Sequence, residues 1–143
     1  MKKDDNCIFC KIVAGKIPCV KIYEDDNSLA FMDIGPVSPG HVLLISKEHF
    51  LTLDEMPAES VAKTCMALPA IVGAVQKATG CGGVNVLQNN GTLAGQVVPH
   101  VHFHIIPRYG KTGEFRFDWP AGKYPDGQMQ QFADKITAYL KNS

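Results

Sequence analysis

The sequence predicts one α+β domain with an antiparallel β-sheet of about five strands, one long helix that is kinked or divided, and a C-terminal helix. Its 143 residues, 1–143, suit a single domain with one hydrophobic core. Short apolar runs of strand length follow one another between turn-forming residues, which is typical of antiparallel strands. Two longer stretches, 58–78 and 128–140, repeat their apolar residues at helical spacing.

The first part of the chain is expected to contain a short helix, a hairpin and a central strand. Residues 11–14 suit one or two helical turns, which the following glycine and proline would end. Strands at 20–24 and 29–33 flank the turn-forming residues 25–28 and so predict a β-hairpin. The nearly continuous apolar run 41–45 predicts a strand that is covered on both faces.

The second part is expected to alternate helix and strand. Pro69 should kink the helix at 58–78 or divide it in two. A strand at 84–88 follows, with a turn at 89–91. The closing helix, 128–140, would bury one apolar face, which consists of Met129, Phe132, Ile136 and Leu140.

Histidines alternate with apolar residues in the stretch 99–108. His100, His102 and His104 stand at every second position, so on a strand their imidazoles would share one face. Neighbouring histidines would be roughly 6.6 Å apart and the outer two about 13 Å apart at Cα, which is too far for one small ion to be held by all three. We therefore expect imidazoles with different roles. The alternative is a polar strand face on which the histidines are incidental.

Charge and targeting features favour a small-molecule ligand. Lysine plus arginine equals aspartate plus glutamate, 14 each, and no block of like charge occurs. A nucleic-acid polymer or a membrane surface is therefore a poor candidate partner. The polar amino terminus has no signal-peptide pattern, and no apolar run approaches the roughly 20 residues of a membrane span, so we expect a cytoplasmic protein.

Five cysteines, an odd number, do not suggest a disulfide framework in such a protein. Cys7 and Cys10 have the spacing of zinc ligands and, with two histidines from elsewhere, would make a tetrahedral site. A redox pair or two plain buried cysteines are the alternatives. His41 and His49 would be about 26 Å apart on an extended chain and should serve different places. Three cysteines are expected to be small buried hydrophobic residues: Cys19, Cys65 and Cys81.

The stretch His100-Val101-His102-Phe103-His104-Ile105-Ile106 matches the His-x-His-x-His-x-x signature, with x apolar, of the histidine triad (HIT) nucleotide-binding family. The resemblance extends over residues 7–109, which we take as the core of the domain, with 110–143 as a C-terminal extension. Because the third position is histidine and not glutamine, the chain resembles the hydrolase branch, which includes bacterial HIT proteins and purine nucleoside phosphoramidases.

The resemblance implies that His102 is the nucleophile and attacks the α-phosphorus of a purine nucleoside phosphoramidate, an AMP or GMP derivative, to form a covalent nucleotidyl-histidine. A main-chain carbonyl would hold its other ring nitrogen. His104 and His41 would donate hydrogen bonds to the phosphoryl oxygens. The alternatives are a dinucleoside polyphosphate hydrolase and a nucleotide-binding or partner-binding HIT protein with vestigial catalysis.

The resemblance also implies a nucleotide pocket. Asn89, Gly95 and Gln96 match a phosphate-binding loop that includes Val97, where many relatives carry a serine. Asp33 would accept hydrogen bonds from the ribose hydroxyls, with a turn residue at the end of a strand as the alternative. The base would lie on apolar residues for which an ordinary core position is the alternative: Phe9, Ile12, Ile17, Phe31 and Ile34.

Three further expectations rest on the resemblance. His49 and His100 would complete, with Cys7 and Cys10, a closed structural Zn²⁺ site, one per chain. The protein would be a homodimer whose two sheets run together. The C-terminal region would help to select the leaving group, through Arg116 or Trp119 for example.

Overall fold

The structure, a computed structural model, describes residues 1–110 and 120–141, so the role expected for Arg116 or Trp119 lies outside the described residues. The chain forms two compact units, Met1–Thr112 and Gly113–Ser143. The first unit contains the sheet and every site discussed below.

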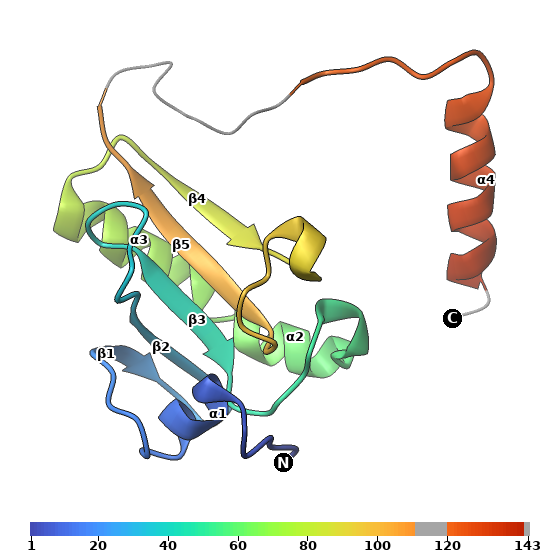
Figure 1. Cartoon of the computed structure of the whole chain (residues 1–143). Coiled ribbons are helices and arrows are strands. Elements are labelled where there is room, and N and C mark those ends of the chain that lie inside the picture. The colour runs from blue at the N-terminus through green and yellow to red at the C-terminus, as the bar shows by residue number, and fades with distance from the viewer. Residues whose placement is uncertain (111–119, 142–143) are drawn as a thin grey trace. The chain divides into compact units, whose positions relative to one another are not determined.

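The five-stranded antiparallel sheet that the sequence predicts is confirmed (Figure 1). Its strand order is β1-β2-β3-β5-β4, so β3 and β5 lie side by side in the interior of the sheet. The hairpin of β1 and β2 closes as expected, because Asp25 Oδ1 accepts hydrogen bonds from the backbone N–H groups of Asn27 and Ser28. The strands are β1 Lys21–Glu24, β2 Ser28–Met32, β3 Val42–Ser46, β4 Gly83–Gln88 and β5 His102–Arg108.

Alternate residues of the central strands pack into two separate clusters, one on each face of the sheet (Figure 1). Phe103 and Ile105 join the cluster covered by α2 (Ala58–Cys65) and α3 (Leu68–Thr79). Leu43 and Ile45 join the cluster covered by α1 (Ile8–Val13). His102 and His104 alternate with Phe103 and Ile105 along β5 and therefore belong to the α1 face.

The helices α2 and α3 confirm the division predicted from Pro69, which lies in the first turn of α3. By length and composition alone the stretch Ala58–Thr79 would also suit a membrane span, a test that core helices of soluble proteins pass as well. Ile71 and Val75 of this stretch are buried against the sheet, and Val61, Leu68 and Val72 pack beside them.

Two boundaries differ from the prediction. The short N-terminal helix begins at Ile8 and so includes Phe9 and Cys10. The histidine strand begins only at His102, because the N–H of His100 donates to the carbonyl of Val98, at 2.8 Å, and bends the chain there. His100 therefore lies before the strand and not on its face.

The second unit contains α4 (Gln128–Lys141), at the predicted position. Within this unit the apolar face that was expected to be buried is not covered: Met129, Phe132, Ile136 and Leu140 are between 48% and 68% exposed. Helical periodicity identifies an apolar face but not the surface that covers it.

Gly40, directly before His41, has a φ of +92°, and a Cβ atom there would come within 2.7 Å of Thr79 Cγ2. We expect Gly40→Ala to lower the free energy of unfolding by about 2 kcal/mol or more, from backbone strain and the contact together. Gly73→Ala is the matched control, because it lies within α3 with open space around it and should be neutral or stabilising by about 0.5–1 kcal/mol. Urea denaturation measures both, and equal effects would contradict the expectation.

Candidate active site and metal centre

A cavity of about 430 Å³ opens on the α1 face of the sheet, a volume that suits a small ligand. Both His102 and His104 line it, together with apolar residues of α1 and β2. The base-pocket and ribose residues expected from the sequence line it too: Phe9, Ile12, Ile17, Phe31, Asp33 and Ile34.

His102 is 5% exposed and its proton position is fixed by the backbone. Its Nδ1–H donates to the carbonyl oxygen of His100, at 2.6 Å. In a neutral imidazole this leaves the lone pair on Nε2. Burial lowers the pKa of His102, which favours this neutral, nucleophilic form near pH 7.

His41 lies next to His104, on the side away from the cavity lining, and is only 2% exposed. The backbone N–H of Val37 donates to His41 Nδ1, at 3.1 Å, so the proton of His41 must be on Nε2. That Nε2 is 2.9 Å from His104 Nδ1, which therefore accepts, and His104 carries its own proton on Nε2. In this structure His41 contacts His104 and is not among the residues that line the cavity.

Burial favours the neutral form of both imidazoles in this hydrogen-bonded pair. Burial lowers the pKa of His41, and burial together with the neighbouring His102 and His41 lowers the pKa of His104 to about 4. A neutral pair is what the hydrogen-bond chain needs, since a proton on His104 Nδ1 would face the N–H of His41.

Asp33 follows β2 at the edge of the cavity. Its Oδ1 accepts from the backbone N–H of Gly35, at 2.8 Å, and its Oδ2 is 3.5 Å from His41 Nε2. The carboxylate thus has oxygens near both the cavity and the histidine pair.

Residues 89–98 are called the phosphate loop here, after the role that the resemblance implies for them. Some of these residues line the cavity, and others only support the loop. Gly95 and Val97 line the cavity, and Val97 is 89% exposed. Asn89 lies outside the lining and donates to the carbonyl of Gly95 at 3.5 Å. The side chain of Gln96 is buried in the loop itself and is likewise not part of the lining.

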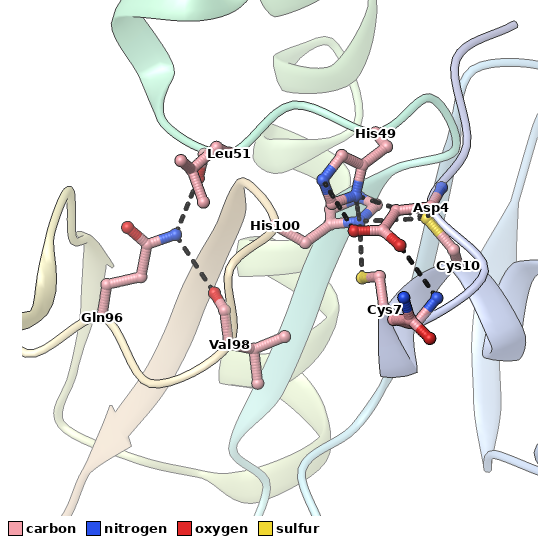
Figure 2. A network of polar contacts seen from close by, with 9 residues as sticks. Asp4, Cys7, Cys10, His49, Leu51, Gln96, Val98 and His100 are labelled. Atoms are coloured by element: carbon pink, nitrogen blue, oxygen red, sulfur yellow. Dashed lines mark hydrogen bonds and ion pairs between the residues drawn. The ribbon is translucent and has the colours of Figure 1, made fainter.

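Cys7, Cys10, His49 and His100 meet in a second, buried cluster (Figure 2), as the resemblance to the HIT family implies. Cys7 Sγ is 3.4 Å from His100 Nδ1, and Cys10 Sγ is 3.4 Å from His49 Nδ1. The two Nδ1 atoms are 3.3 Å apart. The expectation that His41 and His49 serve different places is also met, because His41 pairs with His104.

This donor set fits a tetrahedral zinc ion. With Zn–S of about 2.3 Å and Zn–N of about 2.1 Å, tetrahedral angles put sulfur and nitrogen ligands about 3.6 Å apart and two nitrogens about 3.4 Å apart, close to the distances in the cluster. His100 Nε2–H donates to the carbonyl of Ser46, at 2.8 Å, so its Nδ1 lone pair points to the cluster. Asp4 Oδ2 lies 4.0 Å from the other ring nitrogen of His49.

Comparison with known proteins identifies the family to which the chain belongs. The family model for the HIT domain matches residues 14–111. The chain belongs to the HIT family.

An adenosine 5'-monophosphoramidase of Schizosaccharomyces pombe is 44% identical to this HIT protein over 136 residues, 95% of this chain and 99% of that one. The adenylylsulfatase HINT3 of Arabidopsis thaliana is 51% identical over 104 residues, 73% of this chain, which spans only 53% of that relative's length. The crystal structure of a HIT family member from Bacillus subtilis matches with a TM-score of 0.87 and 43% identity, covering 94% of this chain and 96% of that chain. The HIT-like fold and the predicted class, a HIT-type nucleotide hydrolase, are thereby confirmed.

Several participants in the HIT protein's two sites were missed from the sequence. Val37 and Ser46 act through the backbone, for which a sequence carries no side-chain signal.

Cys19 was expected to be buried, yet it is partly exposed and lines the cavity, and Cys65 and Cys81 are partly exposed as well. Asp4, which lies near His49, was also missed, because a count of charged residues does not distinguish it from the other acidic residues.

Proton positions in the histidine chain can be tested by ¹⁵N NMR. In the HIT protein labelled on its histidines we expect His104 to be protonated on Nε2 and to stay neutral when the pH is lowered from 7 to 5.5, because its pKa is about 4. Between these pH values the unfolded chain gains a proton on His104 that the folded chain does not, so the free energy of unfolding should fall as the pH falls. A His104 protonated on Nδ1 at pH 7 would contradict the assignment.

The matched pair Val37→Pro and Val37→Ala isolates the backbone donor. Proline removes the amide hydrogen that fixes His41, so the tautomers of His41 and His104 should become mixed in the ¹⁵N spectrum. Alanine keeps the amide and, because the Val37 side chain is 62% exposed, should leave the spectrum as in the wild type. Identical spectra for the two variants would rule out the Val37 amide as the determinant.

Proposed function

We propose that this HIT protein hydrolyses purine nucleoside phosphoramidates of the AMP–amine type at the α-phosphorus, through a covalent nucleotidyl intermediate on His102. The observation that carries the proposal is the pinned His102: its Nδ1–H is held by the His100 carbonyl at 2.6 Å, and its ring lines the cavity. The name of the Schizosaccharomyces pombe relative, an adenosine 5'-monophosphoramidase, supports the same substrate class.

The first step forms a bond from His102 Nε2 to the α-phosphorus while the bond from phosphorus to the amine nitrogen breaks. The amine leaves with the bonding electron pair and takes up one proton. In the second step water attacks the same phosphorus, the bond from phosphorus to Nε2 breaks, and a nucleoside monophosphate leaves. His102 regains its neutral form as the bonding electron pair returns to Nε2, and the proton that the attacking water loses goes to solvent.

His104 would act on the phosphoryl oxygens. Its Nε2–H, oriented by His41 at Nδ1, is a donor for the charge that develops there. His41 is then a positioning residue for His104, a more indirect role than the direct phosphate contact expected from the sequence.

The nucleoside would occupy the apolar part of the cavity. Phe9 and Phe31 meet edge to face, with ring centroids 5.6 Å apart, and offer a surface for a purine. Asp33 would accept from the ribose hydroxyls. Val97 offers no hydroxyl to the leaving amine, so proton delivery to that amine would fall to solvent, and turnover should be slower than with a hydroxyl at this position.

We further propose that the cluster of Cys7, Cys10, His49 and His100 holds one structural Zn²⁺ per chain. When bound, zinc would cross-link α1 to the loops before β5 and stabilise the thiolates. With four protein ligands the site has no open position for a substrate. The redox alternative for the cysteine pair is disfavoured, since both thiols are buried beside two imidazoles.

We also propose a homodimer, from the resemblance to the HIT family. The edge strand β4 carries Val86, which is 47% exposed, and an antiparallel edge of this kind can pair with a second copy. A cytoplasmic location stays a prediction.

Turnover of a fluorogenic adenosine phosphoramidate tests the activity. We expect the wild type to exceed His102→Ala in kcat/KM by at least about a hundredfold, because the variant has no nucleophile. Diadenosine polyphosphates are the comparison substrate, and faster turnover of those would favour the rival hydrolase. If the wild type binds AMP in calorimetry but turns over no faster than His102→Ala, the catalytic proposal fails and only nucleotide binding is supported.

Elemental analysis of protein purified without added metal tests the zinc site. We expect one zinc per chain in the wild type and in the control Cys81→Ser, whose thiol lies outside the cluster. Cys10→Ser should lose most of it, because serine is a poor zinc ligand. Less than about a tenth of an equivalent in the wild type would refute the assignment.

A further inference from the structure

The side chain of Gln96 is 6% exposed. Its amide oxygen accepts one hydrogen bond, and its amide nitrogen donates two. Its Oε1 accepts from the backbone N–H of Gly91, at 2.8 Å. Its Nε2 donates to the carbonyls of Leu51, at 2.8 Å, and Val98, at 3.1 Å (Figure 2). A buried amide that loses any of these partners is penalised, so the position of the side chain is tightly determined.

These bonds close the phosphate loop upon itself. Besides the side-chain bond, the backbone N–H of Gln96 donates to the carbonyl of Gly91, at 3.1 Å. The segment between them, Thr92–Ala94, is a short 3₁₀ turn with Gly91 and Gly95 at positive φ on either side. Gln96 therefore sets the distance between the two ends of the turn, and with it the place of Gly95 and Val97 in the cavity.

The two carbonyls that Nε2 contacts belong to the segments that carry the metal-cluster histidines. Leu51 stands two residues after His49, and Val98 stands two residues before His100. The carbonyl of Val98 also accepts from the N–H of His100, at 2.8 Å. A single amide nitrogen thus bridges both segments, and a shift of one against the other would break one of its two bonds.

We propose that Gln96 is a positioning residue that couples the metal cluster to the phosphate loop, so that metal in the cluster and a nucleotide phosphate in the cavity favour each other. Its amide contacts neither ligand. The inference rests on the proposed function in taking residues 89–98 as the phosphate-binding loop, and on the proposed zinc site.

Thermodynamic reciprocity supplies a test that does not need turnover. If zinc strengthens AMP binding, AMP must strengthen zinc binding by the same factor. Zinc affinity is measured by equilibrium competition with a chromophoric chelator, with and without saturating AMP. We expect AMP to raise the zinc affinity of the wild type about fivefold or more, the lower end of typical coupling.

Gln96→Met keeps the length of the side chain and removes its hydrogen bonds, so the effect of AMP on zinc affinity should fall below about 1.5-fold. Gln76→Met is the matched control: the same change on the exposed side of α3, expected to keep the full effect. Gln96→Glu is a second variant of native shape. Its carboxylate would face two carbonyl oxygens and should also lose the coupling.

The outcomes separate the hypotheses. Loss of coupling in the Gln96 variants, with AMP still bound as shown by calorimetry, supports the proposal. An unchanged effect of AMP on zinc in those variants, or none in the wild type that binds AMP, overturns it and leaves the proposed function standing. A wild type that binds no AMP overturns the proposed function and this inference together. If neither variant folds, the wild-type measurement alone still decides whether the coupling exists.

Discussion

The antiparallel pairing of β3 with β5 is the constraint on which both sites depend. Ile45 lies opposite His102 and Leu43 opposite His104, so the register of these two strands fixes which face the imidazoles share. A slip by one residue would turn both histidines to the side of α2 and α3. Both strands are largely buried, and the apolar residues of β3 leave little freedom for another register.

The bend before β5 gives His100 and His102 different roles. His100 leaves the strand direction and turns its Nδ1 to the two cysteines, while its carbonyl holds the Nδ1–H of His102. The same residue thus belongs to the metal cluster through its side chain and to the candidate active site through its backbone. Neutral, oriented imidazoles follow from burial and backbone partners and need no charged group beside the nucleophile.

Much of this arrangement could be predicted from the chain, because it rests on local periodicity and side-chain chemistry. The strands and the division of the long helix near Pro69 are of this kind, whereas the gathering of His49 and His100 with Cys7 and Cys10 was expected only from the resemblance to the HIT family. The amide of Val37 and the inward turn of Gln96 were not predictable, since backbone partners leave no mark on residue identity. The apolar face of α4 was recognised, but its exposure depends on packing that no single helix encodes.

Phe9 stands between Cys7 and Cys10 on the first turn of α1, and its ring lies 5.3 Å from that of His102. Each residue inserted in a helix rotates everything beyond it by about 100°. An insertion between the cysteines would therefore misplace either a thiol or the aromatic wall of the cavity. The two-residue spacing between the cysteines is therefore constrained both by the metal cluster and by the nucleotide cavity. Few insertions, deletions or substitutions at residues 7–10 should preserve both sites.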